Sequence, residues 1–121
     1  MAQSGRSGMH GRVPIEWTER AAGTGSQTAT RAAEANRRHY LMGVIASHAA
    51  ADIQLLTITY TENGVVKTID HYVHNAEVIL FGMPVEADEN TPVTAEMPGT
   101  NEHRIVIWGY TLSSRSAVDR S

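Results

Sequence analysis

The sequence predicts an all-β fold: an antiparallel β-sandwich of about eight strands, jelly-roll-like in connectivity, with a flexible N-terminal arm. Three observations predict it. Apolar and polar residues alternate with a period of two along most of the chain. Turn signals separate these runs at the short intervals typical of sandwiches. The segment with the most helix-forming composition, Ala32–Arg38, has no apolar stripe, so no amphipathic helix is expected there.

The 121 residues suffice for one domain with a single core. We divide them into an N-terminal arm (1–12), a β-sandwich (13–112) and a polar C-terminal tail (113–121). The arm, MAQSGRSGMHGR, has three glycines, two serines and no acid, so it cannot bury enough apolar surface to fold alone. It is expected to be free or to lie across a neighbouring molecule.

The expected strands follow one another between recognisable turns. Gly23–Ser26, His74-Asn75 and Pro98–Glu102 are predicted turns, and Gly82 with Pro84 is expected to end a strand. Asn63-Gly64 is the clearest hairpin signal, because both residues tolerate the positive φ of a tight turn. The predicted strands are Val13–Glu19, Gln27–Ala33, Arg38–Ser47, Ile53–Thr61, Val65–His74, Glu77–Phe81, Thr91–Met97 and His103–Leu112.

The alternation assigns residues to the two faces of each strand. Leu56, Ile58 and Tyr60 should share one face, opposite three threonines, and Tyr40, Met42, Val44 and Ala46 should share another. The last strand is apolar on both faces, with Ile105 and Ile107 on one and Val106, Trp108 and Tyr110 on the other. An isolated sandwich would present a polar outer face to water, so this pattern predicts that the outer face meets another subunit.

Composition excludes several classes of protein. The absence of cysteine removes disulfide scaffolds, thiolate zinc sites, iron–sulfur clusters and thiol nucleophiles. No run approaches the roughly 18 apolar residues of a membrane helix, so no membrane partner is expected. A net charge of −3 gives no reason to expect direct binding of nucleic acid, and Arg6 and Arg12 of the arm would neutralise only about two phosphates.

One set of residues was weighed as a metal site. His71, His74 and Glu77, with the later His103, have the composition of the ligands in cupins, which are jelly-roll metalloenzymes. Cupin histidines are separated by one residue and point to one side. Here His71 and His74 are three positions apart, and residues three apart on a strand face opposite sides. We therefore expect ordinary polar residues near a turn, no metal and no cofactor.

No catalytic constellation is evident, and the chain is not expected to be an enzyme. No serine lies in a Gly-x-Ser-x-Gly elbow, and Gly23-Thr24-Gly25 lacks the lysine and helix of a phosphate-binding loop. The acids at Glu86–Asn90 lack the ligand spacing of a calcium loop and predict a solvated loop. Trp17, Trp108 and Tyr110 are expected in the core or a subunit interface rather than in a ligand platform.

Across Thr28–Thr111 the chain resembles small structural proteins of tailed bacteriophages. The resemblance rests on the order of six short motifs. They are RAAEANRRHY at Arg31–Tyr40, IAS at Ile45–Ser47, LLTI at Leu55–Ile58, YVHN at Tyr72–Asn75, VILFGMPVEA at Val78–Ala87 and WGYT at Trp108–Thr111. The resemblance implies a jelly-roll capsid decoration (cement) protein that sits on the outer surface of the virion and stabilises the lattice of the major capsid protein.

That family implies a homo-oligomer, with a trimer favoured and a dimer possible, and it has no catalytic residues to carry over. We expect the arm and the strand Val13–Glu19 to contact the lattice, because an extended arm can cross a subunit boundary. Two alternatives remain open: a head- or tail-fibre jelly-roll module that binds a host receptor or glycan, and a cupin-like metalloprotein.

Overall fold

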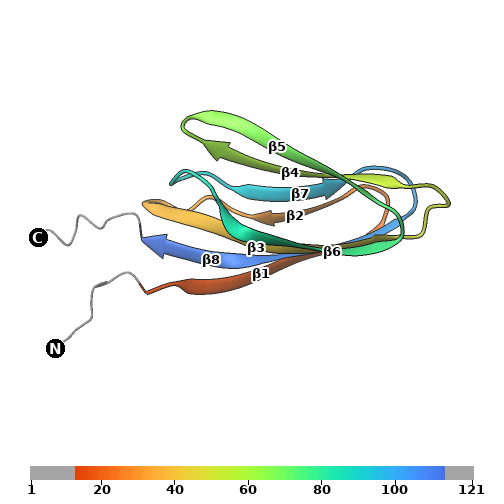
Figure 1. The fold of residues 1–121 in the computed structure, drawn as a ribbon, viewed down its shortest axis with the longest axis horizontal. Coiled ribbons are helices and arrows are strands. Elements are labelled where there is room, and N and C mark those ends of the chain that lie inside the picture. The colour runs from red at the N-terminus through yellow and green to blue at the C-terminus, as the bar shows by residue number, and fades with distance from the viewer. Residues whose placement is uncertain (1–12, 114–121) are drawn as a thin grey trace, which may run out of the picture.

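The computed structural model describes residues 13–113, which form two antiparallel sheets of four strands packed face to face (Figure 1). Sheet A has the strand order β1-β8-β3-β6 and sheet B the order β2-β7-β4-β5. The strands are β1 (Ile15–Thr24), β2 (Gln27–Arg31), β3 (Arg37–His48), β4 (Gln54–Glu62), β5 (Val65–Val73), β6 (Ala76–Glu86), β7 (Val93–Met97) and β8 (Glu102–Ser113). The predicted all-β sandwich of eight strands is confirmed.

The strand order is that of a jelly roll. The first strand pairs with the last, β2 with β7, β3 with β6 and β4 with β5, all antiparallel. This pairing of first with last strands arises when one long antiparallel ribbon folds over itself. The two sheets are completed by the pairing of β3 with β8 and of β4 with β7. β1 begins and β8 ends at the same end of the sandwich, since Ile15 pairs with Thr111 (Figure 1). No helix long and apolar enough to cross a membrane occurs in this part of the chain.

The β4–β5 hairpin turns where the sequence predicts. Asn63 and Gly64 have φ values of 54° and 78°, and Glu62 pairs directly with Val65 across the two-residue loop. Positive φ at both central residues gives a turn whose twist matches that of the strands. The hairpin forms the upper edge of sheet B in Figure 1.

The core lies between the sheets and consists of aliphatic side chains from the inward face of each strand. Leu56 and Ile58 of sheet B face Ile105 and Ile107 of sheet A, and all four are fully buried. The predicted alternation is therefore confirmed on β4 and β8. Other members of the buried cluster include Trp17, Ala29, Leu41, Val44, Ala46, Val73, Val93, Ala95 and Met97.

The prediction for β3 is wrong at its middle. Leu41 pairs with Gly109 while Gly43 pairs with Trp108, so Met42 is an extra residue in the ladder. Such a bulge reverses which side the following residues face. Val44 and Ala46 therefore point into the core, whereas Met42 is exposed.

The expected end of a strand at Gly82 and Pro84 is also wrong. β6 continues to Glu86, although its pairing with β3 is irregular: Leu80 lies opposite Gly43, and Val85 lies opposite Leu41. The four residues between them face a single residue of β3. Proline and glycine thus interrupt the ladder here without ending the strand.

Most other strand boundaries lie within two residues of the predicted ones, and the differences at the ends of β1 and β8 matter most. β1 runs to Thr24, five residues beyond the predicted Glu19, because its second half pairs with Glu102–Val106 of β8. β8 ends at Ser113, which the sequence analysis placed in the tail. The arm (1–12) and residues 114–121 lie outside the described residues, so the expected arm stays a prediction.

Three buried histidines connect strands to loops. The His39 Nε2–H donates to the Ala32 carbonyl (2.8 Å), and its Nδ1 lies 2.6 Å from the Thr111 hydroxyl. His48 lies 2.9 Å from the Val73 carbonyl and accepts from the Ala50 N–H. Their ring nitrogens satisfy backbone groups that burial would leave without water. Burial lowers the pKa of His39, which keeps its ring neutral at pH 7.

His103 forms the third of these connections, at the start of β8. Its ring nitrogens lie 2.9 Å from the Gly25 carbonyl and 3.2 Å from Gln54 Oε1. His103 also pairs with His48 across the β3–β8 ladder. Together the two residues connect one end of sheet A to the β1–β2 turn and to sheet B.

Candidate interaction surface

The outer face of sheet A carries rows of apolar side chains that cross three strands. Directly opposed residues of antiparallel strands share a face. One row contains Val78, Ile45 and Val106, and the next contains Leu80, Gly43 and Trp108. A third row pairs Tyr40 with Tyr110. We call these residues, together with Met42, the sheet A patch.

The aromatic side chains of this patch lie against their neighbours. A Cβ on Gly43 would collide with the ring of Trp108, so the indole lies over the glycine. The rings of Tyr40 and Tyr110 are stacked, with centroids 4.8 Å apart and planes 8° from parallel. Trp108 and Tyr110 lie on the outer face, but they are half-buried and not fully exposed, because each ring packs on backbone or on another ring.

A shallow hollow of about 280 Å³ opens beside Trp108 and Tyr110. Its lining includes Glu16 and Thr18 of β1 and Met42 of the β3 bulge. The hollow therefore combines two aromatic side chains with a carboxylate and a hydroxyl. Such a mixture of apolar walls and a few polar groups is typical of small-ligand sites.

The outer face of sheet B has a different composition. Thr68, Thr59, Thr94 and Thr30 form one row that crosses all four strands. The adjacent row contains two further threonines, Thr28 and Thr57, together with Asp70 and Glu96. Hydroxyl and carboxylate groups remain hydrated on an exposed face, so the centre of this surface suits contact with water. Its apolar exceptions on the edge strand β5 are Val66 and Tyr72, which are 66% and 59% exposed.

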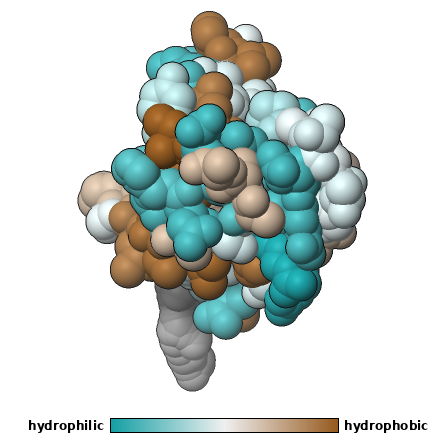
Figure 2. Space-filling view, turned by 90° about the vertical axis from the view of Figure 1, so that its right-hand side faces the viewer, coloured by the Kyte–Doolittle hydropathy of each residue, from teal (hydrophilic) through white to brown (hydrophobic). Residues whose placement is uncertain are grey.

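In Figure 2 one group of hydrophobic residues lies on the lower left of the molecule, on the side of sheet A, and another lies at the top, whereas hydrophilic residues dominate the right flank. On sheet A, Val78 is 61% and Leu80 is 71% exposed. Large apolar side chains this open to solvent mark a surface that another molecule covers.

Each of the two open sides of the sandwich is closed by a contact between polar side chains of edge strands, an ion pair on one side and a hydrogen bond on the other. On one side Arg31 of β2 contacts Glu19 of β1 at 3.0 Å, and its guanidinium carbon lies 5.4 Å from the centre of the Trp17 ring. On the other side His71 of β5 contacts Glu77 of β6 at 2.6 Å. Both pairs join sheet A to sheet B.

The second pair belongs to the set of residues considered as a possible metal site, His71, His74, Glu77 and His103. Glu77 accepts from His71 through Oε1 and from the backbone N–H of His74 through Oε2 (3.1 Å). The hydrogen bond to His71, followed by the bond to the His74 N–H, lowers the pKa of Glu77 to about 2. Both carboxylate oxygens of Glu77 therefore accept hydrogen bonds that connect β6 to β5 and to the turn between them.

The structure gives the metalloprotein alternative no support. Within residues 13–113, no group of three or more histidine, aspartate or glutamate side chains is placed to hold a metal ion. His103, the later histidine of the proposed set, instead lies against Gly25 and Gln54.

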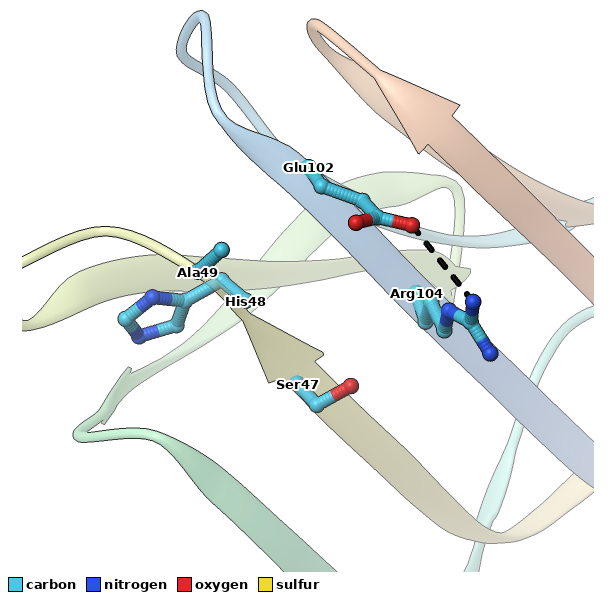
Figure 3. A pocket seen from close by; sticks show the side chains of 5 residues that line it. All are labelled: Ser47, His48, Ala49, Glu102 and Arg104. Atoms are coloured by element: carbon cyan, nitrogen blue, oxygen red, sulfur yellow. Dashed lines mark hydrogen bonds and ion pairs between the residues drawn. The ribbon is translucent and has the colours of Figure 1, made fainter.

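A second hollow of about 360 Å³ lies at the end of β3 and the start of β8 (Figure 3). Glu102 and Arg104 form an ion pair at 3.5 Å in its wall, and Ser47 lies on the neighbouring strand. The His48 ring turns away from this pair in Figure 3, toward its partner at Val73. The hollow is polar and adjoins one end of the sheet A patch.

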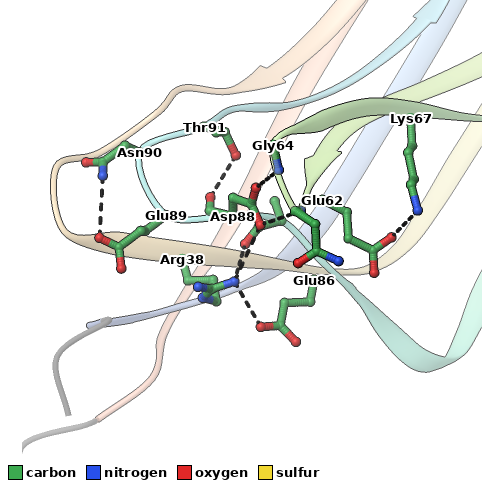
Figure 4. A network of polar contacts seen from close by, with 11 residues as sticks. Arg38, Glu62, Gly64, Lys67, Glu86, Asp88, Glu89, Asn90 and Thr91 are labelled. Atoms are coloured by element: carbon green, nitrogen blue, oxygen red, sulfur yellow. Dashed lines mark hydrogen bonds and ion pairs between the residues drawn. The ribbon is translucent and has the colours of Figure 1, made fainter. Parts of the chain in front are cut away.

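The loop at Glu86–Asn90, predicted to be merely solvated, has a structural role (Figure 4). Asp88 accepts from the backbone N–H groups of Asn63 and Gly64 at 3.0 and 2.8 Å. The bond to Gly64, the stronger influence, lowers the pKa of Asp88. Arg38 adds an ion pair to Glu86 at 3.1 Å. The loop therefore holds the turn of the β4–β5 hairpin.

The aromatic residues singled out by the sequence have different positions. The core prediction is confirmed for Trp17, which is 6% exposed. It is wrong for Trp108 and Tyr110, which are half-buried on the outer face of sheet A. The other expected environment for these two residues, a subunit interface, stays a prediction. Val78 and Leu80 lie on the same surface without having been predicted there, and their alternation with Glu77 and Ile79 is the sequence signal for it.

Comparisons with known proteins add neither a family nor a function. No family model matches the sequence, and no curated protein matches it. Among solved structures the chain is similar to a mutant of CBM29-2, a family 29 carbohydrate binding module. The identity is 13% and the TM-score 0.34, over 91% of this chain and 86% of that chain. A likeness this distant carries no argument about what this chain binds.

Proposed function

We propose that this protein is a non-enzymatic structural component of a virion, a decoration protein on the outside of an assembled bacteriophage head. In this role it binds as a homo-oligomer and stabilises the lattice of the major capsid protein. The observation that supports the proposal best is the contrast between the outer faces of the two sheets. A hydrated threonine face on one side and an apolar face on the other suit a molecule with one side covered and one side in solvent.

Stabilisation follows from mass action. A protein that binds the assembled lattice and not its dispersed subunits shifts the equilibrium toward the assembled state. An oligomer makes several such contacts together, so modest affinity at each adds up where the geometry allows simultaneous binding. The jelly-roll framework supplies a rigid body for this purpose.

We assign the lattice contact to the arm (1–12) and the start of β1. Val13 and Ile15, which follow the arm directly, are 75% and 48% exposed. This apolar pair lies on the β1 side of sheet A, away from β6. Exposed apolar residues next to a terminal arm can extend a contact that the arm begins.

The test is deletion of residues 1–12 followed by measurement of how many copies remain on purified particles. The proposal expects a large loss of occupancy while the deleted protein keeps its far-ultraviolet circular dichroism spectrum. A matched control replaces Arg6 and Arg12 by Lys, which retains length and charge and should leave occupancy unchanged. Full occupancy after the deletion would contradict the assigned contact, and absence of the chain from purified particles would contradict the function.

A second function is favoured by the hollow at Trp108 and Tyr110. In this alternative the chain is a head- or tail-fibre module that binds a host receptor or glycan, with the aromatic rings beneath a sugar and the Glu16 carboxylate accepting hydrogen bonds from its hydroxyl groups. Copy number distinguishes the two functions, since a decoration protein occurs in hundreds of copies per head and a fibre in far fewer. Quenching or shift of Trp108 fluorescence by a glycan, absent from a Glu16→Gln variant, would favour the alternative.

A further inference from the structure

The sheet A patch has a polar border on three sides and none on the fourth. Along β1 the patch meets Glu16, Thr18 and Arg20, which are exposed and pair with β8. At one end it meets Ser47 and Arg104. At the other end lie Arg38 and Glu86, which form an ion pair. Toward β6 the patch continues through Val78 and Leu80 to the edge of the sheet, and Met83, also on β6, is 82% exposed.

The β6 edge also differs from the other three sheet edges. An exposed edge strand presents unpaired backbone groups, and proteins normally protect it with charge, short length or distortion. β1 carries Glu16 and Arg20, β2 has five residues, and β5 carries Lys67 and Asp70.

The segment Ala76–Leu80 of β6 lacks this protection. It is in regular register with Gly43–Ser47 of β3, and the distortion of β6 begins only after Leu80. Its one charged residue, Glu77, is turned to His71 and the His74 N–H. The apolar face and an unprotected edge therefore coincide at Val78 and Leu80.

The surface is large enough for a stable contact. A strand of 12 residues, as in β3 and β8, spans about 40 Å, and four strands are about 19 Å wide. The whole outer face of sheet A, including β1 and the polar border of the patch, thus measures roughly 760 Å², close to the approximately 800 Å² that each partner contributes to a standard interface with its polar rim.

We propose that a second copy of this chain covers the sheet A patch, in a contact centred on the β6 edge at Val78 and Leu80 and on Trp108. A partner for this surface needs an apolar patch that reaches an edge without a polar border. Within residues 13–113 that description fits the sheet A patch itself. Two such patches, joined at β6, form one apolar interface with polar residues around it, the usual anatomy of a protein–protein contact.

The inference rests on the proposed function only in that the function calls for a homo-oligomer, and it names the surface involved. It also separates the two contacts: copies associate through β6, whereas the lattice is bound through the arm and β1 at the opposite edge of sheet A. The separation makes each contact testable without the other.

The experiment measures self-association of the purified full chain, with no particles present, by sedimentation equilibrium across micromolar concentrations. Leu80→Glu should raise the dissociation constant at least tenfold. Thr68→Glu is the matched control, since Thr68 is exposed on β5, the neighbouring edge strand of sheet B, and should not alter it. Val78→Lys is a second test with the opposite charge, and circular dichroism identifies any variant that fails to fold.

A dimer or trimer of the wild type that Leu80→Glu and Val78→Lys dissociate, and Thr68→Glu does not, supports the inference. A wild type that stays monomeric overturns it, as does equal weakening by Thr68→Glu. If the monomeric wild type loses particle binding through Leu80→Glu, the patch contacts the lattice instead and the inference is likewise overturned. If the wild type forms its oligomer but does not bind particles, the result counts against the proposed function alone.

Discussion

The outer faces of the two sheets differ in composition and therefore in the surroundings to which each is suited. Both alternate inward and outward residues, and both give their inward residues to one core. Sheet B presents threonine across its centre, with exposed Val66 and Tyr72 on its edge strand β5, whereas sheet A presents valine, leucine, tyrosine and tryptophan across three strands. Threonine has the branched shape that strands favour together with a hydroxyl that stays hydrated. Sheet A retains the strand-forming shape and leaves out the hydroxyl.

The difference does not arise from strand stability, because both faces are built from good strand formers. It separates a surface adapted to water from one adapted to another protein surface. Substitutions that exchange the chemistry of the two faces should therefore affect association on sheet A and almost nothing on sheet B.

The largest effect is expected for Trp108→Ala, on the proposal that copies associate through sheet A. A central tryptophan of an interface typically contributes 2 kcal/mol or more, about 30-fold in the dissociation constant. Thr59→Ala, at the centre of sheet B, should change the constant less than about twofold. Sedimentation equilibrium of both variants makes the comparison, and equal constants for the two would remove the distinction between the faces.

Gly43→Ala should have the next largest effect. The added methyl group meets the Trp108 ring, which must swing away from β3, so we expect about 1–2 kcal/mol of destabilisation. Thr68→Val on sheet B adds no such contact and should stay within about 0.5 kcal/mol. Urea unfolding measures both, and tryptophan emission reports the moved ring. Unchanged emission from Gly43→Ala would show that the indole does not lie over the glycine.

The sequence predicts the fold well where strands pair without interruption. β4 and β8 have regular ladders with β5 and β1. On these strands alternation alone predicts the residues that face the core, which are Leu56, Ile58, Ile105 and Ile107. β3 fails because the bulge at Met42 depends on how β3 fits β8, a distant part of the chain.

The candidate surface was only partly predictable for the same reason. Alternation places Thr57, Thr59 and Thr61 on one side of a strand, but the row from Thr68 to Thr30 exists only once four strands are aligned. Two apolar faces on the last strand do predict an interface. Which residues of other strands extend it, Leu80 above all, depends on the pairing of β6 with β3.

The hydrogen bond between His71 and Glu77 gives a test on the flank that separates the two faces. Because folding lowers the pKa of Glu77 from 4.5 to about 2, its contribution to stability is complete above pH 4.5. That contribution decreases as the pH falls from 4.5 toward 2. Glu77→Gln should reduce stability at pH 6 and weaken its dependence on pH in this interval.

Urea midpoints of the wild type and of Glu77→Gln, measured every half pH unit, follow this difference. Glu96→Gln on the outer face of sheet B is the matched control, and it should keep the wild-type dependence between pH 4.5 and 2. A Glu77→Gln curve parallel to that of the wild type would mean that the carboxylate does not join β6 to β5 in solution.

The smallest effect is expected at the β4–β5 hairpin of sheet B. Asp88→Asn leaves one oxygen for two backbone N–H groups and places an amide N–H₂ where the other oxygen accepted. Hydrogen exchange at Asn63 and Gly64 should therefore become faster, with little change in the global unfolding midpoint, because the turn opens locally. Glu89→Gln removes a neighbouring charge without touching these bonds and should leave both exchange rates unchanged. If the two variants exchange alike, the loop influences the hairpin through charge alone, and the aspartate does not hold the turn.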